Sequence, residues 1–335
     1  RARYGRLWAY VAMGSVLAVN VLTLAADMAG GSAALGLLTG APYQWFIVPF
    51  AVGIGAFLVW GNYRAMQRVL KYVLLVFVTY VVAAFLAHPN WGDVLYHTLV
   101  PHFDFSSPAY VAGAIALLGT TLTAYAYVWE TIEEAEEQPP LDRLGLAQVD
   151  ATLGMAFSGL LFWFILITTG ATLGVHHHPV QTAQDAVAAL APLAGRYASL
   201  VFGVGLLASA VLAVPVLAGT SAYVMAEAFG WRSSLDTSFQ EAPKFYLALL
   251  LSLLVALGIT LLSIGPIQLL FISSIAGGLA TPITLILMML IARDPQVMGE
   301  HRIGRRLTLG GFAVAAVVTA ACLLYLWQIF MPGGQ

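Results

Sequence analysis

Charged residues are scarce in this chain. Only 9% of its 335 residues are Asp, Glu, Lys or Arg, whereas 60% are hydrophobic, and its mean hydropathy is +0.87. A soluble domain of this size cannot bury so much apolar surface in one core. The composition therefore excludes a soluble protein and predicts an all-α polytopic membrane protein, with the lipid bilayer as its surroundings and no nucleic-acid partner.

Cysteine and membrane-embedded histidine are also missing. The single cysteine, Cys322, excludes an intrachain disulfide framework. All seven histidines lie outside the long apolar segments. An intramembrane metalloenzyme would need clustered His and carboxylate ligands at membrane depth, as in His-Glu-x-x-His. This alternative is therefore the least favoured, and we expect no enzyme activity.

Nine apolar segments are long enough to cross about 30 Å of hydrocarbon, which takes about 20 residues each. The first and sixth are long enough to tilt or to continue along the membrane surface. Together they predict a single transmembrane domain over residues 1–335. The segments are 7–38, 43–61, 66–87, 109–131, 150–174, 196–228, 244–264, 266–292 and 308–331.

The basic residues fall on one side of this arrangement. If the chain starts in the cytoplasm, only Arg196 among the 14 basic residues lies outside. Positively charged loops favour the cytoplasmic side. We therefore expect the start of the chain to be cytoplasmic, in a bacterial cell membrane. The residues placed inside are Arg1, Arg3, Arg6, Arg64, Arg68, Lys71, Arg143, Arg232, Lys244, Arg293, Arg302, Arg305 and Arg306.

One carboxylate lies deep in the first span, within "NVLTLAADMAGGSAAL". An ionisable group at mid-membrane costs about 2.5 to 3.5 kcal/mol on insertion scales, so such residues usually have a function. Asp27 is accordingly a candidate functional residue. The alternative is that it pairs with a hydroxyl such as Thr23 or Ser32 at a helix contact.

The fourth span contains an unusual stretch, "LLGTTLTAYAYVWETIEEAEEQPP" at residues 117–140. Gly119, Thr120, Thr121 and Thr123 interrupt an otherwise aliphatic helix, and both Gly and β-branched Thr weaken helices. This pattern is typical of a discontinuous transporter helix, whose freed carbonyl groups form an ion site. The alternative is that the threonines bond to their own backbone and pack closely on a neighbouring helix.

Two further spans contain small residues and proline. In the eighth span, "SSIAGGLATP" at 273–282 predicts a second interruption or kink. In the sixth span, Pro215 and a face of Ala218, Gly219 and Ser221 favour a close helix contact instead.

The glutamates that follow the fourth span recur every three or four residues. They predict one acidic helix face, with Glu136 beside it, that concentrates cations at an inner vestibule. The alternative is a solvated helix end that pairs with nearby arginines. The "HHH" at 176–178 is either a weak external cation-binding loop or an ordinary polar loop. The members of the acidic face are Glu130, Glu133, Glu134 and Glu137.

Four stretches together resemble the Nramp family of divalent metal transporters, and most closely its divergent branch that lacks the usual metal motif. The resemblance implies a LeuT-like fold of two inverted five-helix repeats, with broken first and sixth helices around a metal site. Residues 1–87 would be the rest of the first repeat, 109–292 the second, and 308–331 an additional helix. The family's first two helices, including the one with its Asp-Pro-Gly-Asn metal motif, have no counterpart in this sequence, and we expect upstream helices to complete the site. The stretches are "ADMAGGSAALGLLTG", "GTTLTAYAYVWETIEEAEE", "LLASAVLAVPVLAGTSAYVMAEAFGWR" and "FISSIAGGLATPITLILMMLIARD".

The resemblance also assigns roles to single residues. Thr120 matches the position of a metal-binding backbone carbonyl, Thr123 that of a methionine thioether, and Ser274 that of a coordinating glutamine. Asp27 matches an aspartate of the proton route, but Gly30 replaces its companion glutamate, and the seventh span has no arginine. The residues Ala124 and Tyr125 replace the family's proline and histidine, and with Gly119 and Thr121 they would form the unwound segment.

These differences predict transport of a divalent cation, Mn²⁺, Fe²⁺ or Mg²⁺, by alternating access without a cofactor. A missing thioether favours harder ions, which bind through oxygen ligands. The loss of titratable groups argues against proton coupling. An organic-solute carrier of the same fold is the alternative. A carrier for a carboxylate substrate would need an accessible cation, and we find no Lys or Arg at membrane depth, away from the ends of the spans.

Overall fold

A computed structural model describes residues 5–60, 78, 80–137, 144–174, 180–188, 195–233, 235, 237, 239–262 and 264–330. Within these ranges the chain is helical and contains no strand, as predicted. The α-helices are α1 (Arg6–Thr39), α2 (Gln44–Trp60), α4 (Trp91–Leu99), α5 (Pro108–Thr121), α6 (Ala124–Glu137), α7 (Leu144–Thr169), α8 (Ala183–Ala188), α10 (Ala198–Phe229), α11 (Pro243–Thr260), α12 (Pro266–Ala292), α13 (Pro295–Met298) and α14 (Arg305–Phe330).

Seven helical segments are long and apolar enough to span a membrane, with α5 and α6 counted together as one segment. Each coincides with a predicted span, and the shorter apolar helix α2 coincides with an eighth. The remaining prediction, 66–87, lies mostly outside the described residues, so the count of nine is not confirmed. Within it, residues 78 and 80–87 are described, and 78 and 80–86 are helical.

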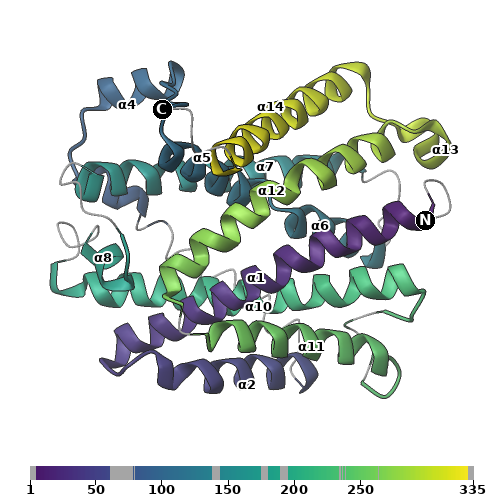
Figure 1. The fold of residues 1–335 in the computed structure, drawn as a ribbon, viewed down its shortest axis with the longest axis horizontal. Helices are drawn as coiled ribbons and strands as arrows, with labels where there is room; N and C mark the ends of the chain where they lie inside the picture. Colours follow the sequence, from purple (N-terminus) through teal and green to yellow (C-terminus); the bar gives the residue numbers. More distant parts are fainter. Residues whose placement is uncertain are drawn as a thin grey trace.

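The long helices α1 and α10 form the centre of the bundle. Figure 1 shows α1 crossing between α10, α11 and α2 on one side and α12, α5 and α14 on the other. The core between α1, α10 and α11 contains fully buried Leu24, Met28, Leu217 and Phe245. Small residues let these helices approach closely, since a Cβ atom added to Gly31 would lie 3.0 Å from that of Ala210 on α10. Packing of this kind stabilises helix contacts where the surroundings are as apolar as the side chains.

Helix α12 runs without interruption from Pro266 to Ala292, so the predicted second break is wrong. Pro282 has no N–H group and cannot bond to the carbonyl of Gly278, four residues earlier. The thiol of Cys322 on α14 donates to that carbonyl instead, at 3.3 Å. The hydroxyls of Ser273 and Ser274 both donate to the carbonyl of Leu270 in the preceding turn. Neighbouring helices and local hydroxyl bonds therefore keep this segment helical.

Two short helices lie in the loops between spans. Helix α8 lies in the loop before α10, at the beginning of an alanine-rich stretch. Helix α4 was not predicted. Its N-cap residue is Asn90, whose side chain accepts a hydrogen bond from the Gly92 N–H. Near its other end, the Thr98 hydroxyl accepts a hydrogen bond from the Trp163 ring of α7. A helix of nine residues is too short to be stable by itself. Its contact with α7 therefore contributes to its stability.

Candidate functional site: a broken helix held against α12

The fourth span is interrupted between α5 and α6. Helix α5 ends at Thr121, α6 begins at Ala124, and only Leu122 and Thr123 lie outside both helices. In the last turn of α5, the hydroxyls of Thr120 and Thr121 donate to the carbonyls of Ala116 and Leu117 at 2.9 and 2.8 Å. The discontinuity and the threonine back-bonding, which the sequence left as alternatives, therefore occur together.

The break is narrower than predicted. Gly119 and Thr121 lie in the last turn of α5, and Ala124 and Tyr125 lie in the first turn of α6, so the prediction that these four residues are unwound is wrong. The physical reason is that the helical bonding of α5 continues to the edge of the break, where the Leu122 N–H donates to the Leu118 carbonyl. The turns on either side keep their helical hydrogen bonds.

Three side-chain contacts hold the broken helix against α12. The Thr120 hydroxyl shares its single proton between the Ala116 carbonyl and the Ser274 hydroxyl, which lies 3.1 Å away. Within the break, the carbonyl of Leu122 accepts a hydrogen bond of 3.2 Å from the Thr281 hydroxyl. In α6, the Tyr127 hydroxyl donates to Thr284. Backbone polarity freed at membrane depth is thus satisfied by neighbouring protein, as lipid requires.

Glycine makes this close approach possible. A Cβ atom added to Gly119 would collide with the backbone of Ser274 and Gly278, and one added to Gly278 would collide with the Ile115 carbonyl. Backbone therefore touches backbone where α5 and α12 cross. This contact brings Thr120 within hydrogen-bond distance of Ser274.

Of the three predicted metal-binding residues, the structure brings Thr120 and Ser274 together. Thr123 lies in the break between the half-helices and is 8% exposed. Among the described residues, no three His, Cys, Asp or Glu side chains converge as they would at a metal site of that kind. The oxygen atoms around this break are hydroxyls and backbone carbonyls.

Asp27 lies half-buried in the middle of α1. The alternative pairing is not what the structure contains, because Thr23 and Ser32 donate to the carbonyls of Val19 and Met28 in their own helix. The carboxylate instead lies within electrostatic range of Tyr125, at the start of α6. An ionisable group of the central helix therefore lies near the start of α6.

The predicted acidic face is described in part. Glu130 is exposed and Glu134 is half-buried, whereas the side chains of Glu133 and Glu137 lie outside the described set. The histidines at 176–178 also lie outside the described residues. The sequence predicts no role for Glu136 beside this face. Its carboxylate accepts a hydrogen bond of 2.6 Å from Tyr223 on α10. The 87 positions between them hide this pair from any local pattern.

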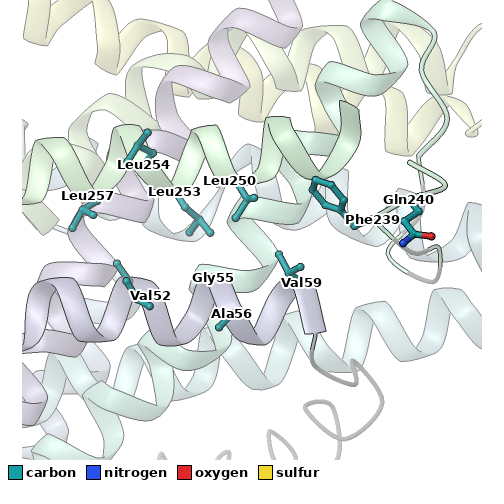
Figure 2. Close-up of a pocket in the computed structure, with 11 residues that line it drawn as sticks. Val52, Gly55, Ala56, Val59, Phe239, Gln240, Leu250, Leu253, Leu254 and Leu257 are labelled. Carbon is teal, nitrogen blue, oxygen red and sulfur yellow. The ribbon is translucent and has the colours of Figure 1, made fainter. Parts of the chain in front are cut away.

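A separate groove lies between α2 and α11. Figure 2 shows its lining, with Val52 and Val59 on α2 and Leu253 and Leu257 on α11. Its volume is about 590 Å³, and Gln240 is the polar side chain at its rim. The groove shares no residue with the broken helix, and its apolar lining is unsuited to a bare ion.

These features define the class of protein. Long apolar helices surround one broken helix, as in the LeuT-like transporters, which are membrane transporters rather than enzymes. A solved structure of a manganese transporter from Eremococcus coleocola, in complex with an aromatic bis-isothiourea substituted compound, has this fold. It aligns with a TM-score of 0.74 and 17% identity, over 98% of this chain and 72% of that one.

The particular family follows from the sequence comparison. The family model described as natural resistance-associated macrophage protein-like matches residues 1–328, so the chain belongs to the Nramp family. A divalent metal cation transporter MntH from Deinococcus radiodurans is 27% identical, over 98% of this chain and 75% of the relative. One from Clostridium acetobutylicum is 26% identical, over 76% of this chain and 57% of the relative.

Proposed function

We propose that this protein transports divalent metal cations across a bacterial cell membrane by alternating access around the break between α5 and α6. The observation that carries the proposal is the contact between Thr120 and Ser274 beside a helix that is interrupted at Leu122 and Thr123. Its relatives named as divalent metal cation transporters support the substrate class. Broken helices at mid-membrane commonly carry the substrate site in such folds.

The oxygen atoms at the junction support a preference for hard ions. Hydroxyl and carbonyl oxygens suit Mg²⁺ and Mn²⁺, whereas a thioether would favour softer transition metals. Thr123 stands where the family resemblance predicts that thioether. We therefore infer that Mn²⁺ is carried with little discrimination against Mg²⁺.

Proton coupling is weak or absent in this proposal. Asp27 is the carboxylate of α1 near the start of α6, and Gly30 one turn later offers no second titratable group. Helix α11 likewise contains no arginine. Of the three places compared with the family's proton route, only that of Asp27 keeps its titratable group.

We further propose that α6 faces the cytoplasm and that Glu130 and Glu134, with Glu133 and Glu137, attract cations to its mouth. Figure 1 places the start of α1 and helix α13, both close to arginines, at the same end of the bundle. The positive-inside rule supports assigning this end to the cytoplasm. We also propose that residues 1–87 are the rest of the first repeat, 109–292 are the second repeat, and 308–331 form an additional helix.

Uptake into liposomes that contain the purified full-length protein tests the proposal. We expect Mn²⁺ to enter and Mg²⁺ in large excess to reduce its uptake, with no accompanying change of internal pH. Thr120→Val should slow uptake by tenfold or more, about 1.4 kcal/mol. Thr121→Val is the matched control, because its hydroxyl bonds only within α5. Full uptake by the Thr120→Val variant, which keeps the backbone carbonyl, would contradict a role for the Thr120 hydroxyl in the site.

A further inference from the structure

One buried hydroxyl connects three segments at the end of the bundle where α6 lies. The Tyr223 hydroxyl on α10 donates to the Glu136 carboxylate at 2.6 Å and accepts from the Leu235 N–H at 2.9 Å. Tyr223 is 4% exposed, whereas Glu136 is at the surface of α6. A surface carboxylate is thus fixed by a donor that belongs to the core.

Aromatic contacts around Tyr223 also join α6 to α10. Its ring packs edge-on against Phe245 of α11 at 4.8 Å and against Trp129 of α6 at 6.2 Å between centroids. One turn earlier on α10, a Cβ atom added to Gly219 would lie 2.9 Å from the Trp129 ring. The ring of Trp129 and the carboxylate of Glu136 therefore contact α10 at neighbouring positions, two turns apart on α6.

A second buried tyrosine provides a comparison. The Tyr246 hydroxyl on α11 donates to the Thr237 carbonyl at 2.7 Å, and Tyr246 is 3% exposed. Both tyrosines bond to the same connection between α10 and α11. The Tyr223 hydroxyl reaches Glu136 on α6, whereas the Tyr246 hydroxyl lies against the carbonyls of Leu235 and Thr237.

We propose that Tyr223 is a positioning residue that fixes the inner half-helix α6 against α10 through Glu136, and that this bond must break for α6 to move. Glu136 then differs in role from the acidic face beside it, because its carboxylate is used for docking. A hydrogen bond to a carboxylate is stronger than one between neutral groups. The inference rests on the proposed alternating access, which gives the movement of α6 a function.

The test measures how fast a cysteine on α6 reacts with a water-soluble thiol reagent. Ile132 of α6 is half-buried against the core, so Ile132→Cys is a reporter that reacts faster when α6 moves away, in a background that carries Cys322→Ser. The full-length protein in liposomes needs no metal for this measurement. We expect Tyr223→Phe to raise the labelling rate by about five- to tenfold.

Further variants distinguish loss of the Tyr223–Glu136 bond from a general destabilisation of the helix bundle. Tyr246→Phe also removes one buried hydroxyl from the same connection, and it should leave the labelling rate unchanged within twofold. Glu136→Ala should raise the rate as much as Tyr223→Phe, and the double variant should raise it no further. Glu136→Gln keeps an acceptor oxygen and should give a smaller increase.

Equal effects of Tyr223→Phe and Tyr246→Phe would overturn the proposal, as would additive effects of Tyr223→Phe and Glu136→Ala. Unchanged labelling in the Tyr223→Phe variant would do the same. Metal uptake is measured separately on the same liposomes. A failure of uptake with the expected labelling pattern would refute the transport proposal and leave the docking bond established.

Discussion

The hydroxyl of Thr281 on α12 lies 3.2 Å from the carbonyl oxygen of Leu122, inside the break between α5 and α6. The same hydroxyl lies 2.8 Å from the Gly277 carbonyl of its own helix. A side chain of a continuous helix therefore compensates for a backbone bond that the broken helix lacks. The two helices share one polar junction at membrane depth.

Removing this donor should destabilise the break. We expect Thr281→Val, which keeps the shape of the side chain, to cost about 1–3 kcal/mol, because the Leu122 carbonyl is left without that partner. Thermal unfolding in detergent measures the loss. Thr281→Ser keeps the hydroxyl and should retain most of the stability, so equal losses in both variants would contradict this explanation.

The helix crossing should tolerate no side chain at Gly119. Gly119→Ala places a Cβ atom against the backbone of Ser274 and Gly278, and overpacking of this kind costs about 1–3 kcal/mol or more. Gly113 lies on the same helix, and an added Cβ atom there meets nothing within 4 Å. We expect Gly113→Ala to unfold at the same temperature as the parent protein or slightly higher, because Ala favours helix.

A methionine at position 123 should restore selectivity for softer metals. Thr123→Met places a thioether in the break, and thioethers bind transition metals better than Mg²⁺. We expect Mg²⁺ in excess to inhibit Mn²⁺ uptake at least tenfold less in this variant, about 1.4 kcal/mol. Thr123→Ser keeps an oxygen ligand and is the control. Unchanged inhibition by Mg²⁺ in an active Thr123→Met variant would argue against Thr123 as a ligand position.

Two substitutions of a buried amide on α1 should differ in their effect on stability. Asn20 is fully buried, its Nδ2 group donates to Ser221 at 3.3 Å, and its Oδ1 atom has no hydrogen-bond partner. Asn20→Asp would place acceptor oxygens against the Leu217 carbonyl and should cost several kcal/mol, since a buried charge without a partner is expensive.

Asn20→Leu removes the unsatisfied oxygen together with its donor. The Ser221 hydroxyl still donates to the Leu217 carbonyl at 2.8 Å, so neither group is left without a bond. We expect this variant to unfold within about 1 kcal/mol of the parent protein. Thermal unfolding of the two variants side by side measures the difference. A Leu variant less stable than the Asp variant would refute this account of Asn20.

Much of the fold could be predicted because membrane insertion constrains the sequence strongly. Apolar runs of sufficient length located all seven described spans, and the Gly-Thr-Thr stretch located the break near Leu122. The second predicted break failed at Pro282. Local composition suggested a weak helix there, but the Cys322 thiol of another helix supplies the missing donor. No local pattern includes such a partner.

The sequence by itself determined the membrane class, the spans and the interrupted fourth span, because each depends on hydropathy and backbone propensity within a few turns. The tertiary structure decided which polar groups meet: Thr120 with Ser274, Thr281 with the Leu122 carbonyl, and Glu136 with Tyr223. These partners are separated by 87 to 159 positions. Only the packing of helices around glycines brings them within hydrogen-bond distance.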